Sequence, residues 1–408
     1  ALAVWKTALS DQELADLTYP TPTFPTFTLD FNTIAEQFTF ARGSEATYVD
    51  AQGLIQSTAS NNAPRLDYST GAEAFLLEPQ STNLITYSED FSQWDIVRAT
   101  STANASVSPD GASNAYKLQS SVTSNNGSWY REILSSFSGN YEFSVFAKAG
   151  TTNFLQLRVD GIGGVIFDLS DGTIKSQANA VGSVSDYGNG WYRCSIQLTA
   201  SSSTTLLIIV GNENMTSSVW NTTIGDLIYL YGAQLEQQSY ATSYIPSDGS
   251  QTTRNQETCI NATPEINSEE GVLYAEISAL ANDGTVRYIS ISDGTSSNVI
   301  YIRYDNVFNR IIGTVTANGI SPASFVSTSY DILNFNKIAL KWKTNDFALW
   351  INGVEVGSDL IGNSFAANVL NDLSFSRVGS QNFFGNTKDI QIYPKALSDA
   401  ELIKLTTI

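Results

Sequence analysis

The sequence predicts an all-β protein built from tandem antiparallel β-sandwiches with very short capped helices. First, apolar and polar residues alternate along many short segments, which is typical of strands that bury one face. Second, these segments recur about every ten residues, separated by Gly, Asn, Asp and Ser, as in antiparallel sandwiches. Third, only 15% of the residues are charged. The surface must therefore consist largely of Ser, Thr, Asn, Gln and Gly, which suits strands better than helices.

The strand pattern is strongest in residues 94–246, which we assign to one sandwich. Tyr141, Phe143 and Val145 line one face of a predicted strand. The fully apolar run TTLLIIVG is typical of a strand in the middle of a sandwich. Cys194 belongs to the dry face of its strand, so we expect a buried free thiol rather than a disulfide.

Residues 265–408 predict a second sandwich, and the polar residues 247–264 predict a linker between the two. In KIALKWK, Trp342 belongs to a dry face, and the lysines form a face that is mostly wet. Asn352-Gly353 lies between FALWI and VEVG. This dipeptide predicts a two-residue type I′ hairpin turn.

Both ends of the chain carry the same short pattern of a strand followed by a capped helix. The segments Ala3–Thr18 and Gln391–Thr406 match at eight positions in register. Ser398 with Glu401 three residues later forms a capping box, and the first segment repeats it. Residues 1–20 are therefore predicted to end an upstream sandwich. We expect the chain to be processed or to be part of a longer protein.

The composition excludes several partners and chemistries. The formal net charge is −19, which argues against nucleic acid, because its binding depends on neutralising phosphates. No apolar run approaches the roughly 20 residues of a membrane span, so membrane insertion is not expected. The chain has no histidine. It therefore cannot carry Ser–His–Asp or Cys–His machinery, a histidine zinc site or an imidazole pH switch.

Residues Phe38–Trp94 resemble a segment that recurs in tail and appendage proteins of tailed bacteriophages. The resemblance is carried by Ala41-Arg42-Gly43-Ser44, by the step from Tyr48-Val49-Asp50 to Gly53-Leu54-Ile55, by Pro64-Arg65-Leu66-Asp67-Tyr68, and by Thr82-Asn83-Leu84 before Tyr87-Ser88. On this basis residues 21–93 are predicted to be an extended connector followed by a phage-type, β-rich adaptor.

Three further segments, Tyr141–Lys148, Gly188–Arg193 and Tyr229–Pro246, resemble a jelly-roll module that is similar to carbohydrate-binding modules. Residues Gly271–Leu405 resemble a lectin sandwich of the laminin-G/concanavalin type, which usually ends in a strand followed by ALSDEEI. The resemblance implies that the first sandwich is a jelly roll and the second is lectin-like. It also implies that the N-terminal segment ends an earlier lectin-like sandwich.

Sugar binding needs aromatic faces together with a few fixed polar groups. The best jelly-roll aromatics beside polar loops are Trp129 with Tyr130, then Trp220, then Trp191. Each of these rings can instead plug the sandwich core or cap its open ends. Both interpretations stay open at this point.

Carboxylates and amides in predicted turns are candidate ligands for Ca²⁺. They are Asp110 and Asn114 in the jelly roll, and Asp293, Asp305 and Asn309 in the lectin-like domain. Ca²⁺ takes roughly six to eight oxygen ligands, so carbonyls and water would have to complete either site. The alternative for each is an ordinary Asx turn.

We expect no enzymatic activity. The Glu-x-Asp-x-x-Glu strand motif of sandwich-type glucanases is absent, and a chain without histidine cannot carry the Gln-x-His strand of sandwich-type alginate lyases. The predicted function is that of a non-enzymatic protein of the phage virion surface, a tail-fibre or appendage adhesin for host-surface glycans. By analogy with fibre proteins, it is expected to be a homotrimer that contacts other virion proteins.

Two other functions stay open. One is a structural capsid or tail decoration whose sandwiches are spacers. The other is the non-catalytic accessory part of a secreted enzyme that degrades polysaccharides.

Overall fold

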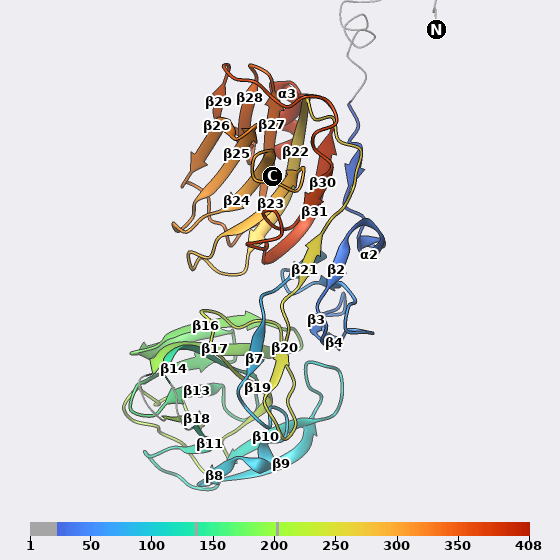
Figure 1. The fold of residues 1–408 in the computed structure, drawn as a ribbon. Helices are drawn as coiled ribbons and strands as arrows, with labels where there is room; N and C mark the ends of the chain where they lie inside the picture. Colours follow the sequence, from blue (N-terminus) through green and yellow to red (C-terminus); the bar gives the residue numbers. More distant parts are fainter. Residues whose placement is uncertain (1–22, 135–137, 201–203) are drawn as a thin grey trace, which may run out of the picture.

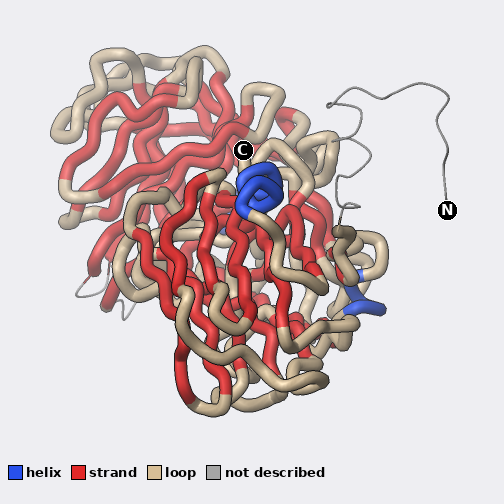
Figure 2. Tube along the Cα trace, turned by 90° about the horizontal axis from the view of Figure 1, so that it is seen from above, coloured by secondary structure: helices blue, strands red, loops and turns tan. Residues whose placement is uncertain are grey.

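The computed structural model describes residues 23–134, 138–200 and 204–408 and shows strands arranged in two β-sandwiches (Figures 1 and 2). The predicted all-β class is confirmed. The pattern predicted for residues 1–20 lies outside the described residues. The helices that the structure describes are short: α2 (Ile34–Gln37), η1 (Phe91–Gln93) and α3 (Asp399–Thr406).

The first sandwich consists of two six-stranded antiparallel sheets. The first sheet has the order β16 (Val181–Asp186), β17 (Trp191–Ala200), β12 (Gly139–Ala149), β19 (Leu227–Glu236), β10 (Ala115–Ser120) and β9 (Ala99–Ser106). The second has the order β15 (Thr173–Ala178), β14 (Gly163–Asp168), β13 (Phe154–Val159), β18 (Thr204–Gly211), β11 (Ser128–Leu134) and β8 (Asp95–Val97). Phe143 and Val145 from one sheet and Leu157 and Ile208 from the other share one buried core. The alternation in the sequence therefore marks the face that each strand buries.

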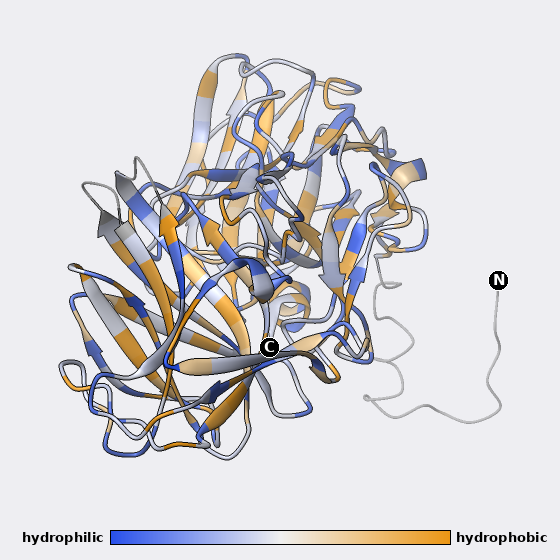
Figure 3. Cartoon of the chain, turned by 90° about the horizontal axis from the view of Figure 1, so that it is seen from below, coloured by the Kyte–Doolittle hydropathy of each residue, from blue (hydrophilic) through white to orange (hydrophobic). Residues whose placement is uncertain are grey.

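The second sandwich pairs an eight-stranded sheet with a five-stranded sheet. The larger sheet has the order β29 (Val354–Asp359), β28 (Phe347–Ile351), β27 (Asn336–Lys343), β22 (Glu270–Ala279), β31 (Gly385–Tyr393), β6 (Ala74–Leu77) and β5 (Arg65–Asp67), and β1 (Phe27–Thr28) also pairs with β31. The smaller sheet has the order β26 (Ile320–Ser327), β25 (Ile311–Ala317), β24 (Val299–Tyr304), β23 (Arg287–Ser292) and β30 (Asp372–Ser374). Figure 3 shows apolar residues concentrated along the strands.

The N-terminal segments complete the second sandwich, although most of the sequence separates them from the strands that they pair with. Residues 21–93, predicted as connector and adaptor, supply β1, β5 and β6 to its larger sheet, and Phe75 and Leu77 enter its core. The predicted linker 247–264 also contains strands. Its residues form β20 (Thr252–Arg254), which pairs with β7 (Ser81–Asn83), and β21 (Thr258–Ile260), which pairs with β2 (Thr39–Ala41), while β3 (Thr47–Val49) and β4 (Ile55–Ser57) form a separate hairpin. In Figure 1 these segments run side by side between the two sandwiches, so the jelly roll is an insertion in the remaining fold.

A buried ionic network holds this junction together. Its members are Arg42, Arg65, Glu78, Arg254 and Glu257, and all five are buried. Arg65 donates two parallel hydrogen bonds to Glu257, of 2.9 and 2.5 Å, and a third to Glu78 of 2.8 Å. Arg42 pairs with Glu257 at 2.8 Å, and Arg254 pairs with Glu78. Removing one partner of such a network leaves a buried unpaired charge, which costs about 3–5 kcal/mol.

Several local predictions are confirmed. Asn352 and Gly353 both have positive φ, 51° and 80°, and connect β28 to β29. Ser398 and Glu401 form the reciprocal capping box of α3. Cys194 and Cys259 are both buried and free.

One predicted wet face is instead covered. On the face of β27 opposite Trp342, Ala339 is buried, and Lys341 is buried with an ion pair to Asp346 of 2.6 Å. The cover is α3, whose Leu402 packs into the apolar cluster on this face. Within the described residues, no helix has the length and apolar character needed to cross a membrane.

Candidate functional site

One sheet of the first sandwich carries polar side chains on its outer face. Successive side chains of a strand point to opposite faces. On β12, Phe143 points into the core, so Glu142 and Ser144 point outward, and the same rule places Arg193 and Ser195 of β17 beside them. The outward set comprises Glu142 and Ser144 of β12, Arg193, Ser195 and Gln197 of β17, Ser183 and Ser185 of β16, and Gln234 and Glu236 of β19. Most of these polar groups are buried, so the rest of the chain must cover them.

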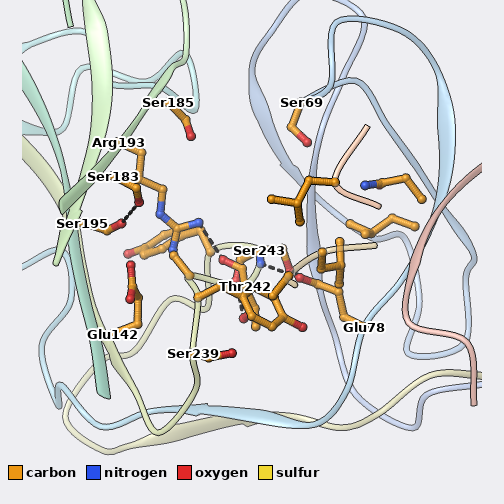
Figure 4. A pocket seen from close by; sticks show the side chains of 18 of the residues that line it. Ser69, Glu78, Glu142, Ser183, Ser185, Arg193, Ser195, Ser239, Thr242 and Ser243 are labelled. Atoms are coloured by element: carbon orange, nitrogen blue, oxygen red, sulfur yellow. Dashed lines mark hydrogen bonds between the residues drawn. The ribbon is translucent and has the colours of Figure 1, made fainter. Parts of the chain in front are cut away.

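The cover leaves a cavity of about 700 Å³ between the two sandwiches. The polar sheet face forms one wall of the cavity, and the loop 239–244 crosses this sheet face (Figure 4). Tyr48, Ser69 and Glu78 of the N-terminal segments and Asn282, Asp283, Phe308 and Leu333 of the second sandwich supply the other walls. Ligand sites in proteins are concave and of this size, and this cavity brings together residues from three parts of the sequence.

Arg193 is the central cation of the cavity. Its Nη1 donates to the Thr242 carbonyl oxygen at 2.6 Å, and its Nη2 donates to Ser144 Oγ at 3.1 Å. The guanidinium also lies 5.3 Å from the ring centroid of Phe146. These contacts hold the crossing loop on the sheet, and because both partners are neutral groups, Arg193 keeps its positive charge.

Glu142 is a buried carboxyl group at the wall of the cavity. Burial raises its pKa to about 7, and the negative charge of Glu236 adds to this against the lowering effects of Ser195 and Arg193. Glu236 lies directly opposite on β19 and accepts hydrogen bonds from Ser81 Oγ at 2.6 Å and the Thr242 amide at 3.0 Å. Glu142 therefore exchanges its proton near neutral pH, whereas Glu236 is stabilised by hydrogen bonds.

The other carboxylates of the cavity wall already have protein partners. Asp67 accepts from the Val49 amide at 2.8 Å and from the Ser69 amide at 2.9 Å. Asp283 pairs with Arg287 at 3.0 Å. Burial raises the pKa of Glu78, but the charges of Arg254 and Arg65 outweigh it and hold the value at about 2.

Phe308 supplies an exposed aromatic ring at the cavity. It lies in the loop between β24 and β25, lines the cavity and is 64% exposed. Leu333 lines the same wall and is also exposed. An aromatic face beside hydroxyl groups is the combination that sugar binding requires. The sequence prediction missed Phe308, although it named Asp305 and Asn309 on either side of it.

Two of the predicted sugar-binding rings are core residues. Tyr130 is 0% exposed, stacks on Phe91 with ring centroids 5.2 Å apart and donates to Ser101. Trp191 is 2% exposed, and its Nε1 donates to the Val107 carbonyl oxygen at 3.0 Å. A ring without accessible surface cannot stack on a sugar, so the predicted role of Tyr130 and Trp191 is corrected. Tyr130 belongs to the core between the two sheets, whereas Trp191 packs with Ile55 and Tyr244 in a buried cluster on the outer face of its sheet.

The structure brings Trp129 and Trp220 together, but outside the cavity. The two rings meet edge to face with centroids 5.5 Å apart on the outer face of the other sheet. The guanidinium of Arg98 lies 4.4 Å from the Trp129 centroid, and that of Arg158 lies 5.1 Å from the Trp220 centroid. These two half-buried rings anchor a loop to the sheet, and a sugar-binding role for them stays a prediction.

The carboxylates predicted to bind Ca²⁺ have hydrogen-bond or ion-pair partners within the protein, and Ca²⁺ binding stays a prediction. Asp305 is buried and pairs with Arg310 and with Arg303, the latter at 3.2 Å, so cations of the protein already occupy its carboxylate. Asn309 accepts from Asn282 Nδ2 at 2.8 Å, which fastens two loops of the cavity wall.

The other two predicted positions are Asx turns. Asp110 accepts from the Ala112 amide at 2.8 Å and from Asn114 Nδ2 at 3.0 Å. Asp293 accepts from the Thr295 amide at 2.9 Å. Among the residues that the structure describes, no group of three or more acidic or cysteine side chains could hold a metal ion.

No protein-family model matches the chain, and no curated protein sequence matches it. Among solved structures, the chain is similar to a Ruminococcus gnavus IT-sialidase CBM40 bound to alpha2,3 sialyllactose, with 18% identity, coverage of 34% of this chain and 84% of that one, and a TM-score of 0.30. It is similar to a SAP-like pentraxin from Limulus polyphemus, with 12% identity, coverage of 35% and 72%, and a TM-score of 0.29. It is also similar to domains LG4-5 of the mouse laminin alpha1 chain, with 10% identity, coverage of 67% and 90%, and a TM-score of 0.25. These similarities are distant, and a shared ligand does not follow from them.

Proposed function

We propose that this chain binds carbohydrate in the cavity between its two sandwiches and does not turn it over. The observation that carries the proposal is the outer face of the β16–β17–β12–β19 sheet. Burying hydroxyl, amide and charged groups costs free energy unless each finds a partner. These polar groups lie beside a cavity of about 700 Å³. Such an arrangement is expected where the groups recognise a polar ligand.

The side chains around the cavity match the two kinds of surface that a sugar presents. Ser183 and Ser185 on β16 and Ser69 opposite them are exposed hydroxyl groups that line the cavity. Ser185 can donate and accept hydrogen bonds with sugar hydroxyls, whereas Ser69 and Ser183 already bond to Asp67 and Ser195 and can still accept. Phe308 offers an apolar face to the C–H side of a ring.

The carboxylates argue for binding without catalysis. Hydrolysis of a glycosidic bond uses two carboxyl groups on either side of the bond, roughly 5–10 Å apart. Asp67 and Asp283 are fixed by hydrogen bonds or an arginine, and Glu78 belongs to the ionic network. Among the carboxyl groups that the structure describes on the cavity wall, burial raises the pKa of Glu142, whereas the pKa values of Glu78 and Asp283 are lowered. We therefore propose a binding protein rather than a glycosidase.

The proposed biological role is attachment of a tailed-phage appendage to glycans of the host surface, at the outside of the virion. Its support is the resemblance of Phe38–Trp94 to phage virion segments. In the fold these residues form the junction that positions both walls of the cavity. Contacts with other virion proteins and assembly into a homotrimer stay predictions.

The test is an array of bacterial surface polysaccharides probed with the full chain, followed by titration of the best ligand. Phe308→Ala should weaken binding by about tenfold, equivalent to roughly 1.4 kcal/mol. Stability should be unchanged, because the ring is mostly exposed. The matched control is Phe24→Ala, which removes another exposed ring that does not line the cavity.

Equal loss of affinity in both phenylalanine variants would contradict the assignment of the cavity. No binding to any glycan would favour the alternative of a spacer within the virion. Release of reducing ends from the bound polysaccharide would show that the chain is an enzyme and would end the proposal of binding without turnover.

A further inference from the structure

A second hollow continues from the cavity along the edge of the first sandwich. It measures about 610 Å³ and is lined by Asn140, Gln177, Asn179, Ala180, Val181, Gln197, Leu198 and Thr199. Val181 and Gln197 also line the main cavity. The two hollows therefore meet at these two side chains, which face each other across β16 and β17.

The connection follows an exposed edge strand. β16 has only one neighbour in its sheet, β17. Val181, Ser183 and Ser185 point to the same face of β16 and are all exposed. Strand residues rise about 3.3 Å each, so this row is roughly 13 Å long. It presents an apolar side chain that is 61% exposed next to two hydroxyl groups, a surface over which a sugar chain can extend.

The charges of the two hollows disfavour an acidic ligand. Among the described residues that line the main cavity, Asp67 and Glu142 have no salt-bridge partner, whereas Glu78 and Asp283 are paired with arginines. Arg193 donates to the Thr242 carbonyl oxygen and to Ser144 Oγ, and these contacts fix its guanidinium against the sheet. Among the residues that the structure describes, none that lines the second hollow is charged, and the chain carries a net charge of −19. Like charges in a partly desolvated site repel.

We infer that the ligand is a neutral, unbranched oligosaccharide that runs from the main cavity along β16 into the second hollow. The inference rests on the proposed function and names its substrate class. The second hollow contributes amide groups, which donate and accept hydrogen bonds with sugar hydroxyls in the same way that serine hydroxyls do. A chain of several sugar units is needed to reach both hollows.

The test uses the polysaccharide that binds best in the array and its partial hydrolysate, fractionated from monosaccharide to hexasaccharide. Affinity should rise at least tenfold with length and then level off once both hollows are filled. Sialyllactose serves as the acidic probe and should bind at least tenfold more weakly than a neutral trisaccharide.

The variant Thr199→Trp fills the second hollow from an exposed position on β17. It should remove the gain with length while leaving affinity for the shortest bound fragment unchanged. The control is Thr102→Trp, at an exposed position on β9 at the other edge of the same sheet.

The outcomes separate the two proposals. If no glycan binds, the proposed function itself fails. If glycans bind but affinity does not depend on length, or if the length dependence survives Thr199→Trp, the extended site is wrong. If the preferred ligands are acidic, the neutral substrate class is wrong while carbohydrate binding stands. Should Thr199→Trp fail to fold, the length series on the unaltered chain still decides the inference.

Discussion

The larger sheet of the second sandwich and the first sheet of the jelly roll both have an outer face that the rest of the chain covers. On the second sandwich, Tyr274, Ala339 and Trp350 form an apolar surface, and Leu402 of α3 closes it. On the jelly roll, Glu142 and Ser195 face a cavity instead.

The difference shows how the same architecture serves stability in one place and recognition in another. Apolar side chains under a helix gain free energy from being removed from water. Polar side chains that are covered by a loop and a neighbouring domain gain no free energy from removal from water. The three predictions that follow alter one face or the other, in order of decreasing expected effect.

The largest effect is expected from Leu402→Ala on the closed face. Leu402 is 0% exposed, so truncation leaves a cavity and should lower the free energy of unfolding by about 2–5 kcal/mol. Ile403→Ala, at the exposed neighbouring position, is the control and should change it by less than about 0.5 kcal/mol. Urea unfolding measures both variants. Similar losses would mean that α3 does not close this face.

The second effect is pH-dependent and concerns Glu142→Gln on the polar face. Burial raises the Glu142 pKa from 4.5 to about 7. The folded state therefore holds this proton more tightly than the unfolded state. The stability that results is fully present below pH 4.5 and is lost as the pH rises through 7.

Glutamine cannot ionise, so the variant lacks this loss. As the pH rises from 4.5 to 7, the unfolding free energy of the variant should increase by about 3 kcal/mol relative to that of the unaltered protein. Thermal or urea unfolding across the pH range measures the difference. A difference that stays constant with pH would show that Glu142 ionises as freely in the folded protein as in the unfolded chain.

The smallest effect is expected from Ser398→Ala, which removes the cap of α3. Loss of an N-cap hydroxyl costs about 1 kcal/mol, and Ser398→Thr, which keeps the hydroxyl, should restore most of it. Binding of glycan should be unaffected in both variants, because α3 covers the closed face only. A loss of affinity would show that the two faces are coupled.

Much of the local structure follows from short-range pattern. The Asn352-Gly353 turn, the Ser398 cap and the dry face around Trp342 each depend on residues close together in the sequence, and all three are confirmed. The sequence could not reveal that Leu77 of β6 pairs with Gly385 of β31. No local pattern encodes the partner of a short, fully buried strand.

The candidate site was only partly predictable. The predicted dry face of Phe143 and Val145 leaves Glu142 and Ser144 on the opposite face of the strand, but an exposed polar face and a covered one have the same pattern in sequence. Trp191 lies beside a polar loop in the sequence, which left both a sugar-binding and a packing role open, and it is buried with Ile55 and Tyr244. Phe308 lies in the same loop as the predicted metal ligands Asp305 and Asn309. Exposed loop aromatics of the second sandwich would have been the signal to follow.

The ionic network between Arg65, Glu78 and Glu257 has a consequence for how such a protein can evolve. Arg65 and Glu78 precede the inserted jelly roll in the sequence and Glu257 follows it, and the charge of Glu257 is neutralised by arginines of the preceding flank. A genetic exchange that transferred the jelly roll together with only one flank would leave an unpaired charge in the buried interior. Inheritance of this architecture should therefore involve the two flanks as one unit, with the domain between them free to be replaced.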